Sequence, residues 1–488
     1  MTSMNIAALV LRHGRMRPQS EAIRDGERSI TYGELTQLVL RTASYLKNLG
    51  LTPRDRVGIC LKDSADFIVA LLGTTVLGAV AVPLDWRARP AENGQLIKPA
   101  DVKLVLVEPG ALPIAACSNV PVDAAWHSAV ARLQAAQPAR TNWNDPFIIS
   151  ASSGSTGAPK LTLMTHLQYY FAMSGMLEVM GLAGSHRYLN TLPFYFASGR
   201  NSTMAHLLRG DCAILYSRLF DAGEYAEIAR CRAATVGVMV PTMVRRLLAS
   251  WRRDVPLLPG FDALYCCGAP LYPAEKLEAL HRLTPRFHDR YGTAETLVIA
   301  ALRPEAIARR PESVGQPHSL GEIEVVDDRD CLLPTGATGH LRYRAPGLAL
   351  PLPGTSAEAA FRGGWFYPGE IAHVDDFGFI FFQGRASEII VRGGGVKINP
   401  AEIEQVLCEH PDIMEAAVIG QTVANKEESA VAFVVARREM PVSDLIAHCR
   451  ARLTTHKVPQ QFQFLSQLPK NTAGKIDKPA LRALMPDA

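Results

Sequence analysis

Hydrophobic and polar positions alternate along the first half of the chain with two different periods. Apolar residues recur at helical spacing from Ser29 to Gly50. Within this stretch, Thr31 and Glu34 have the spacing of a capping box, and Gly50 is a typical helix stop. Continuous apolar runs, typical of buried strands, separate such helical stretches: RVGICL (56–61), FIISAS (147–152) and ATVGVMVP (234–241). This alternation predicts α/β layers with largely parallel sheets.

The longest uncharged run, Phe67 to Leu84, has about the length of a membrane span. Glycine and threonine interrupt the run, Pro83 closes it, and acidic Asp63 and Asp85 flank it without a basic neighbour. These features favour a buried helix followed by a buried strand. We therefore expect no membrane-spanning segment.

After about Ala337 the pattern changes to short strands rich in glycine, proline and aromatic residues. A helix is expected from 400, with Asn399 as its cap and Pro400 at its first position. Strands are expected at AAVIG (416–420) and AVAFVVA (430–436), and a further helix capped by Ser443. We predict a large layered α/β domain over residues 1–384 and a small α+β domain over residues 385–488.

The composition is that of an ordinary globular protein, with 48% hydrophobic and 20% charged residues and a net charge of +4. So small a charge does not favour a nucleic-acid or membrane-surface partner. The nine cysteines show no C-x-x-C spacing, which indicates reduced thiols rather than a disulfide framework or a zinc site. No signal peptide is apparent at the N-terminus, and we expect a cytoplasmic protein.

A loop of small and hydroxyl-bearing residues follows the expected strand at 147–152. Glycine lets the backbone approach an anion closely, hydroxyls and free N–H groups donate to phosphate oxygens, and Lys160 adds a positive charge. Ala158 and Pro159 separate Gly157 from Lys160, so the loop is not a Walker A motif. The expected polyphosphate ligands are Ser152, Ser153, Gly154, Ser155, Thr156, Gly157 and Lys160.

The loop SSGSTGAPK resembles the signature of the acyl-adenylate-forming superfamily, which contains acyl- and aryl-CoA ligases, peptide-synthetase adenylation domains and beetle luciferases. Further segments resemble that superfamily in its order over nearly the whole chain. They are LPFYFASG (192–199), YCCGAPL (265–271), YGTAE (291–295), GHLRYRAPG (339–347), WFYPGE (365–370), GRASEIIVRGGGVKINPAEIE (384–404) and LPKNTAGKIDK (468–478). Together they indicate the acyl-CoA ligase branch.

The resemblance implies a two-step reaction. A carboxylate attacks the α-phosphorus of ATP and expels pyrophosphate, and a thiol then displaces AMP from the acyl-adenylate. Lys475 matches the lysine that bridges the carboxylate and the α-phosphate, and Glu295 matches the acidic residue that helps to hold Mg²⁺. The implied co-substrates are ATP and coenzyme A.

Further positions match nucleotide-binding residues of the superfamily. Tyr291 and Arg385 match an adenine-stacking tyrosine and a ribose-contacting arginine; the other expected contacts are Gly268, Ala269, Pro270, Gly292, Thr293 and Glu370. Two positions depart from the usual pattern. Ala294 replaces a threonine whose hydroxyl touches the α-phosphate, so this contact is missing or comes from Thr293 or Thr296. Glu370 replaces an aspartate that accepts from the ribose hydroxyls.

The small C-terminal domain is expected to act as a mobile lid. Ser387 matches the hinge position, and Gly393, Gly394 and Gly395 match a hairpin that swings to the active site for the thioester step. Two half-reactions would then use two faces of one domain.

The acid pocket is less clearly defined. Phe196 stands where amino-acid-activating relatives carry an aspartate, which disfavours an α-amino acid substrate. Many CoA ligases carry a histidine there, so Phe196 departs from them too, and its two interpretations are a gate for the thiol and a wall of the acyl pocket. The expected apolar wall for an aryl or medium aliphatic acid is Phe194, Tyr195, Phe196, Val240, Cys266, Cys267 and Gly268, although each side chain is equally compatible with ordinary core. Arg200 and His206 are weaker candidates for binding a second carboxylate.

We predict an AMP-forming acyl-CoA ligase. The alternative is a stand-alone adenylating enzyme that loads the phosphopantetheine arm of a carrier protein. A minor alternative is a nucleotide-binding protein with a degenerate site, because of the departures at Ala294 and Glu370.

Overall fold

The structure is a computed structural model and describes residues 5–152, 160–392, 396–422, 428–470 and 476–485. The chain divides into two compact units. The first contains residues 1–311, 315–322 and 343–366, and the second contains residues 312–314, 323–342 and 367–488. The second unit therefore includes segments that precede residue 385, and the predicted division of the chain at 384/385 stays a prediction.

The helices of the first unit are α1 (Ile6–Met16), α2 (Tyr32–Asn48), α3 (Ala65–Val76), α4 (Pro90–Ile97), α5 (Ala124–Arg132), α6 (His166–Met180), α7 (Ala197–Arg209), α8 (Ala222–Cys231), α9 (Pro241–Ser250), α10 (Pro273–Arg282), α11 (Pro304–Ile307) and the 3-10 turn η1 (Glu358–Ala360). Its strands are β1 (Glu21–Asp25), β2 (Arg28–Thr31), β3 (Arg56–Cys60), β4 (Val80–Pro83), β5 (Val102–Val107), β6 (Ser118–Pro121), β7 (Pro146–Ser152), β8 (Lys160–Thr165), β9 (Arg187–Asn190), β10 (Cys212–Leu215), β11 (Val236–Met239), β12 (Ala263–Cys267), β13 (Phe287–Tyr291), β14 (Ala300–Leu302), β15 (Gln316–Pro317), β18 (Leu350–Pro351), β19 (Phe361–Arg362) and β20 (Trp365–Phe366).

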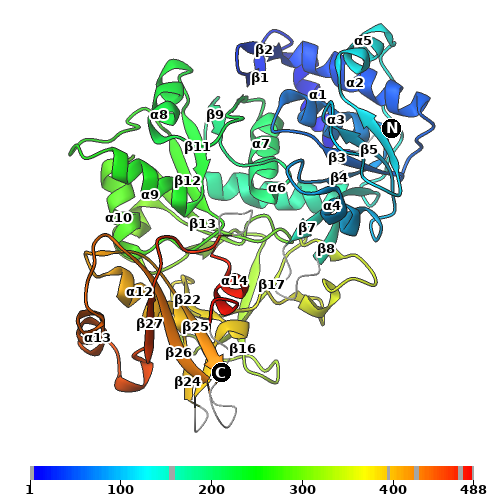
Figure 1. Ribbon diagram of the computed structural model, residues 1–488. Helices are drawn as coiled ribbons and strands as arrows, with labels where there is room; N and C mark the ends of the chain where they lie inside the picture. The colour runs from blue at the N-terminus through cyan, green and yellow to red at the C-terminus, as the bar shows by residue number, and fades with distance from the viewer. Residues whose placement is uncertain (1–4, 153–159, 393–395, 423–427, 471–475, 486–488) are drawn as a thin grey trace. The chain divides into compact units, whose positions relative to one another are not determined.

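Two largely parallel sheets organise the first unit. One has nine strands in the order β15-β14-β13-β12-β11-β9-β10-β1-β2, and the other has seven in the order β18-β8-β7-β4-β3-β5-β6. Antiparallel pairs occur only toward their ends, at β1–β2, β13–β14, β14–β15, β7–β8 and β8–β18. Buried apolar strands of this kind need helices on both faces, and Figure 1 shows α9 and α10 on one side of β11–β13 and α6 and α7 on the other.

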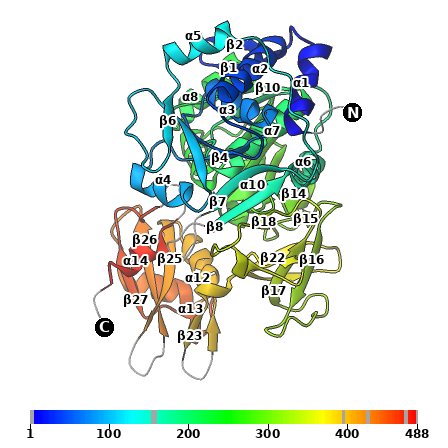
Figure 2. The ribbon, with the colours of Figure 1, turned by 90° about the vertical axis from the view of Figure 1, so that its right-hand side faces the viewer.

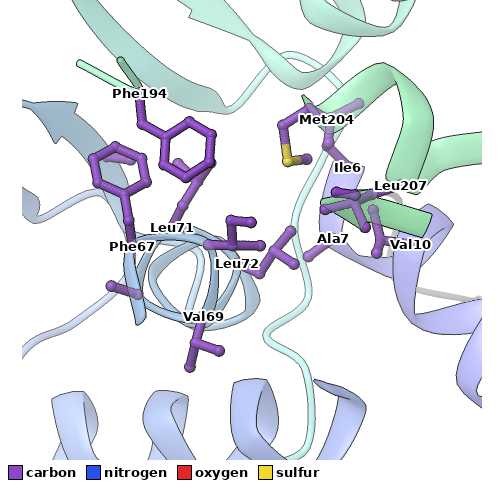
Figure 3. Close-up of a cluster of buried hydrophobic side chains, with 14 of the residues drawn as sticks. Ile6, Ala7, Val10, Phe67, Val69, Leu71, Leu72, Phe194, Met204 and Leu207 are labelled. Carbon is purple, nitrogen blue, oxygen red and sulfur yellow. The ribbon is translucent and has the colours of Figure 1, made fainter. Parts of the chain in front are cut away.

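Helices α1, α3 and α7 meet in the apolar core of this unit. Figure 3 shows Leu72 of α3 between the aromatic pair Phe67–Phe194 on one side and Ile6 of α1 and Met204 of α7 on the other. Each of these side chains is at most 1% exposed. Helix α3 is buried on every face and contacts strands of both sheets. A helix that is apolar all round requires such surroundings.

The uncharged run at 67–84 therefore is the buried helix α3 followed by the buried strand β4, as predicted. None of the described helices is long and apolar enough to cross a membrane. All nine cysteines are free thiols.

The second unit contains β21 (Glu370–Val374), β22 (Ile380–Arg385), η2 (Ala386–Glu388), β23 (Ile390–Arg392), β24 (Val396–Ile398), α12 (Pro400–Cys408), β25 (Ile413–Thr422), β26 (Glu428–Ala436), α13 (Val442–Arg450), η5 (Thr455–Lys457), β27 (Gln461–Phe464) and α14 (Lys478–Arg482). β16 (Glu322–Val326) and β17 (Gly339–Arg344) contain residues of both units.

The paired strands β25 and β26 have apolar side chains on both faces. One face packs with α12 and α13 through Val418 and Val434, and the other packs with α14 through Ile419 and Phe433. Figure 2 shows these helices around the strands. Burial on both faces explains why the strands read as continuous apolar runs instead of alternating ones.

The helix ends mostly follow the sequence. Thr31 and Glu34 form the predicted capping box of α2, and the side chain of Asn399 accepts from the N–H of Ala401 at the start of α12. The prediction of Ser443 as a cap is wrong, because α13 already begins at Val442 with Pro441 as its cap. The ring of Pro441 restricts its φ, and its extended backbone leads directly into the helix at Val442. Ser443 then lies inside the first turn.

A buried ion pair connects α10 to β13. Lys276 Nζ lies 2.7 Å from Asp289 Oδ2, with side chains 3% and 10% exposed. We expect Lys276→Met to lower the free energy of unfolding by about 3–5 kcal/mol, because Asp289 is left as an uncompensated buried charge. Urea unfolding followed by circular dichroism measures the loss. The double variant Lys276→Met/Asp289→Leu should recover most of it, whereas exposed Lys47→Met should lose nothing; an unchanged midpoint in Lys276→Met would contradict the assignment.

Candidate active site

Four neighbouring parallel strands of the nine-stranded sheet end at one edge. β13, β12, β11 and β9 are adjacent and parallel, and their last residues are Tyr291, Cys267, Met239 and Asn190. In open α/β sheets, ligands bind outside the carboxyl ends of such strands. The fold therefore brings together the segments 191–196, Val240, 268–270 and 291–295, which the sequence predicts to bind nucleotide and acid.

The segment after β12, residues 268–270, leaves room for a ligand to approach its backbone closely. Gly268 has a φ of +94°, a conformation that favours glycine, and a Cβ placed on it would have only Val240 Cγ1 as a neighbour, at 3.5 Å. Gly268 and Pro270 are exposed and Ala269 is half-buried. Backbone of this kind offers the flat, accessible surface expected on one side of a purine ring.

The turn after β13 places Glu295. A Cβ on Gly292 would lie 2.5 Å from Leu297 O, so only glycine permits this tight turn. Thr293 O accepts from Leu297 N at 2.9 Å, and Thr293 Oγ1 accepts from Glu295 N at 3.3 Å. The main-chain oxygen of Glu295 accepts from Ala349 N at 2.9 Å, next to β18, which pairs with β8. The main chain of Glu295 is thus held between the turn and the segment that leads into β18.

The missing hydroxyl at Ala294 has one candidate replacement. Thr296 is 2% exposed, and its Oγ1 accepts from Thr293 N at 3.0 Å inside the turn. Thr293 is half-buried and retains accessible surface. Of the two threonines, Thr293 has the more accessible surface, while its Oγ1 also bonds within the turn; a role in place of the missing hydroxyl stays a prediction.

The phosphate-loop segment connects two antiparallel strands. β7 ends at Ser152 and β8 begins at Lys160, and these two residues are paired across the hairpin. This strand–loop–strand connection differs from the strand–loop–helix of a Walker A motif, in agreement with the sequence. Residues Ser153 to Gly157 lie outside the described residues.

The acid segment between β9 and α7 carries the three aromatic residues. Phe194 is 1% exposed and packs against Phe67 in the core with ring centroids 5.2 Å apart (Figure 3). Tyr195 and Phe196 are half-buried and pack on each other at 4.1 Å. Tyr195 and Phe196 are therefore the aromatic side chains with accessible surface, while Cys266 is 0% exposed and belongs to the core.

In the second unit, the structure pairs two of the predicted ribose ligands. Glu370 in β21 and Arg385 at the end of β22 are in register, and Arg385 Nε lies 3.8 Å from Glu370 Oε1. Glu370 is 8% exposed. Ser387 lies in the turn η2. Lys475 and the glycines 393–395 lie outside the described residues.

Comparisons with known proteins agree with this geometry. The AMP-binding enzyme family model matches residues 10–351, and the AMP-binding enzyme C-terminal domain model matches residues 402–475. The chain belongs to the AMP-binding enzyme family.

Relatives of this AMP-binding enzyme match it over almost its whole length. It is 29% identical to the indoleacetate–CoA ligase of Aromatoleum aromaticum over 99% of this chain and 98% of the relative. It is 29% identical to the 2-succinylbenzoate–CoA ligase of Bacillus licheniformis over 94% and 96%. The structure of a benzoate CoA ligase from Burkholderia xenovorans superposes with a TM-score of 0.86 at 26% identity, covering 98% and 99%.

These similarities confirm three predictions. The chain has the α/β fold of the acyl-adenylate-forming superfamily with a large N-terminal and a smaller C-terminal part, it is an acid–thiol ligase, and its main assignment as an AMP-forming acyl-CoA ligase agrees with relatives that are CoA ligases. The roles of individual site residues stay predictions.

One suggestion about the AMP-binding enzyme is wrong. Arg200 and His206 do not face a second carboxylate of a substrate, because they are 2% and 0% exposed. His206 Nδ1 lies 2.8 Å from Asp211 Oδ2, and its ring stacks on Tyr188. Arg200 donates to main-chain oxygens of the acid segment and to Ser150 Oγ at 2.8 Å. Both are interior residues, and the residues that surround them come together only when the chain folds.

Charged residues that the sequence did not single out for the site surround the acid segment. Asp63 Oδ1 accepts from Phe194 N at 2.6 Å, and Arg87 donates to the Tyr195 hydroxyl at 2.5 Å while pairing with Asp85 at 3.3 Å. Burial raises the pKa of Asp63 to about 6, opposed by the Phe194 N–H and by Arg87. The only sequence signal was that Asp63 and Asp85 flank the apolar run, which says nothing about contact with residues 194–195.

The donor set of the site fits a magnesium ion that is also bound by phosphate. Among residues 5–152, 160–392 and the later described stretches, no group of three or more His, Cys, Asp or Glu side chains is arranged to hold a metal ion. Mg²⁺ commonly takes one or two carboxylates plus substrate phosphates and water. Glu295, in the turn after β13, would supply one such carboxylate.

Proposed function

We propose that this protein is an AMP-forming ligase that joins an aromatic or medium-chain aliphatic carboxylic acid to coenzyme A. The observation that carries the proposal is the meeting of the acid segment, the Gly268 segment and the Glu295 turn at the carboxyl edge of β9, β11, β12 and β13. Relatives that act on indoleacetate and 2-succinylbenzoate support an aryl substrate.

In the first step, a substrate carboxylate oxygen attacks the α-phosphorus of ATP. The bond from that phosphorus to the bridging oxygen breaks, and pyrophosphate leaves with the electron pair. Glu295 would hold Mg²⁺, which neutralises charge on the phosphate oxygens when bound. Lys160, the loop 153–157 and Lys475 would supply the remaining positive charge and donors, and Thr293 would supply the hydroxyl that Ala294 lacks.

In the second step, the sulfur of coenzyme A attacks the acyl carbon of the adenylate. The carbon–oxygen bond to phosphate breaks, AMP leaves with the electron pair, and the thiol proton passes to solvent. Glu370 and Arg385 would bind the ribose, Gly268–Pro270 and Tyr291 the adenine, and Ser387 and Gly393–Gly395 would serve the lid movement.

Tyr195, Phe196 and Val240 are the partly exposed apolar side chains at the acid side of the strand edge. Because none of these three offers a carboxylate to an α-ammonium group, an amino acid substrate is disfavoured. Apolar surface of this kind fits an aryl ring or a medium alkyl chain.

Pyrophosphate release with indole-3-acetate, benzoate, ferulate, 2-succinylbenzoate, octanoate and phenylalanine tests the proposal. We expect turnover with at least one of the first five acids, dependent on coenzyme A and yielding the acyl-CoA by mass spectrometry, and none with phenylalanine. Release that requires hydroxylamine, with coenzyme A inert, would instead point to a carrier-protein acceptor. ATP binding without pyrophosphate release from any acid would overturn the ligase.

A further inference from the structure

The acid segment, residues 191–196, is a short irregular connection between β9 and α7, and charged side chains hold its backbone. At Phe194, the N–H donates to Asp63 Oδ1 at 2.6 Å and the C=O accepts from Arg200 Nη1 at 3.0 Å. The same guanidinium nitrogen also donates to Tyr195 O at 3.2 Å. The Asp63 carboxylate thus holds the N–H of Phe194, and the Arg200 guanidinium holds its C=O.

Arg200 is unusual as an interior residue. It is 2% exposed, and among the described residues no carboxylate lies within ion-pair distance of it. Burial lowers its pKa to about 10, so it remains charged at neutral pH. A buried unpaired guanidinium is costly, and a methionine would fill similar space without that cost. Packing alone therefore does not account for an arginine here.

The partners of Arg200 belong to two segments of the proposed site. Nη1 bonds to the acid segment, and Nη2 donates to Ser150 Oγ in β7, two residues before the strand ends at the phosphate-loop segment. The donors of a planar guanidinium have a fixed geometry. Arg200 therefore holds the two segments in a fixed relative position more rigidly than a lysine would.

Asp63 is anchored in turn. Its main-chain oxygen accepts from Ser217 Oγ at 2.5 Å, and it immediately precedes the N-cap of α3, the most deeply buried helix of the unit. The charged groups that face its carboxyl are Arg87 and Asp85, and Arg87 also holds the hydroxyl of Tyr195. The accessible aromatic pair Tyr195–Phe196 is therefore fixed through both its backbone and the hydroxyl of Tyr195.

We propose that Asp63 and Arg200 are positioning residues that clamp the acid segment and thereby set the wall of the acid pocket. The role rests on the proposed ligase function. Neither residue touches the reacting atoms; they act through the main chain of residues 194–195. Charge-assisted hydrogen bonds are stronger than neutral ones. When they are lost, we expect Tyr195 and Phe196 to become less well ordered.

The test uses the full-length protein with Asp63→Ala, Asp63→Asn, Arg200→Met and Arg200→Lys, at pH 8, where Asp63 is ionised. With the best acid of the panel, Asp63→Ala should raise KM for the acid about ten- to hundredfold while KM for ATP stays within about threefold. Asp63→Asn keeps an acceptor oxygen and should recover most of the loss. Arg200→Met should raise KM for both acid and ATP, because it also releases Ser150, and Arg200→Lys should do so less.

Hydrogen exchange measured by mass spectrometry on the peptide around residues 190–199 provides a readout that does not depend on activity. Exchange at Phe194 N–H should accelerate in Asp63→Ala and stay near wild type in Asp63→Asn. Ser217→Ala, which removes only the contact to the main-chain oxygen of Asp63, is the matched control for kinetics and exchange. Unchanged acid KM in Asp63→Ala, or unchanged exchange in both Asp63→Ala and Arg200→Met, would overturn the clamp.

The two proposals fail in different ways. An inactive wild type with the predicted exchange differences would overturn the ligase and retain the clamp as a feature of the fold. An active wild type whose variants match it in KM and exchange would retain the ligase and overturn the clamp. A variant that is unfolded by circular dichroism is replaced by its conservative partner, Asp63→Asn or Arg200→Lys, whose exchange still decides the outcome.

Discussion

Replacing Lys475 with alanine is expected to reduce pyrophosphate release by at least about 10²- to 10³-fold, the typical effect of removing one positioned donor from a developing charge. The lysine matches the superfamily residue that bridges the carboxylate and the α-phosphate, where negative charge accumulates as the new bond forms. Pyrophosphate release measured with saturating acid and ATP gives the loss in kcat. The KM values should change far less, because the contact is made mainly in the transition state.

Two comparisons make the Lys475 result specific. Lys47→Ala, at an exposed lysine near the end of α2, should behave as wild type. Thioester formation from chemically prepared benzoyl-AMP and coenzyme A, with benzoate as the accepted acid, should retain most of its rate in Lys475→Ala, since that step involves no attack on phosphorus. If Lys475→Ala released pyrophosphate at the wild-type rate, the assigned role would be wrong.

Replacing Glu295 with glutamine is expected to have the second-largest effect. If Glu295 holds Mg²⁺ as proposed, the variant weakens magnesium binding, since a neutral amide oxygen replaces a charged ligand. We expect the Mg²⁺ concentration for half-maximal pyrophosphate release to rise about tenfold or more, and the maximal rate to fall about 10²-fold. A Mg²⁺ titration at fixed ATP measures both quantities.

The control for Glu295 is exposed Glu305→Gln, which should leave the Mg²⁺ titration unchanged. AMP carries no β- or γ-phosphate whose charge Mg²⁺ would neutralise, so calorimetry should find AMP binding to Glu295→Gln close to wild type. Lost AMP binding would indicate a disturbed turn in place of a lost metal ligand. An unaltered Mg²⁺ requirement would exclude Glu295 as that ligand.

The local pattern of the sequence was sufficient for most elements. The capping box at Thr31 and Glu34, the Asn399–Pro400 helix start and the apolar strands β3, β7 and β11 follow from interactions between near neighbours, which the sequence displays directly. Ser443 failed as a cap because proline and serine compete for the same few positions at a helix start, and only the formed backbone shows which position begins the turn.

The candidate nucleotide site could be proposed from the sequence, because its expected residues lie in contiguous segments; their roles stay predictions. A strand ends within each of the segments YCCGAPL and YGTAE. Because these two strands are parallel, the loops that follow them lie at the same edge of the sheet. The two threonines that could replace the hydroxyl missing at Ala294 are equivalent in the sequence. The structure distinguishes them only by exposure: Thr296 is buried and Thr293 is half-buried, while both hydroxyls bond inside the turn.

By itself, the sequence determined the family and the alternation of helices and strands, because these depend on residues close together in the chain; the segments it proposes for the chemistry stay predictions. Only the tertiary structure decided that Arg200 and His206 are interior residues and that Asp63, Arg87 and Arg200 converge on residues 194–195. Asp63 and Phe194 are 131 positions apart. A contact over such a distance depends on how α3, β9 and α7 pack, and no local periodicity encodes that packing.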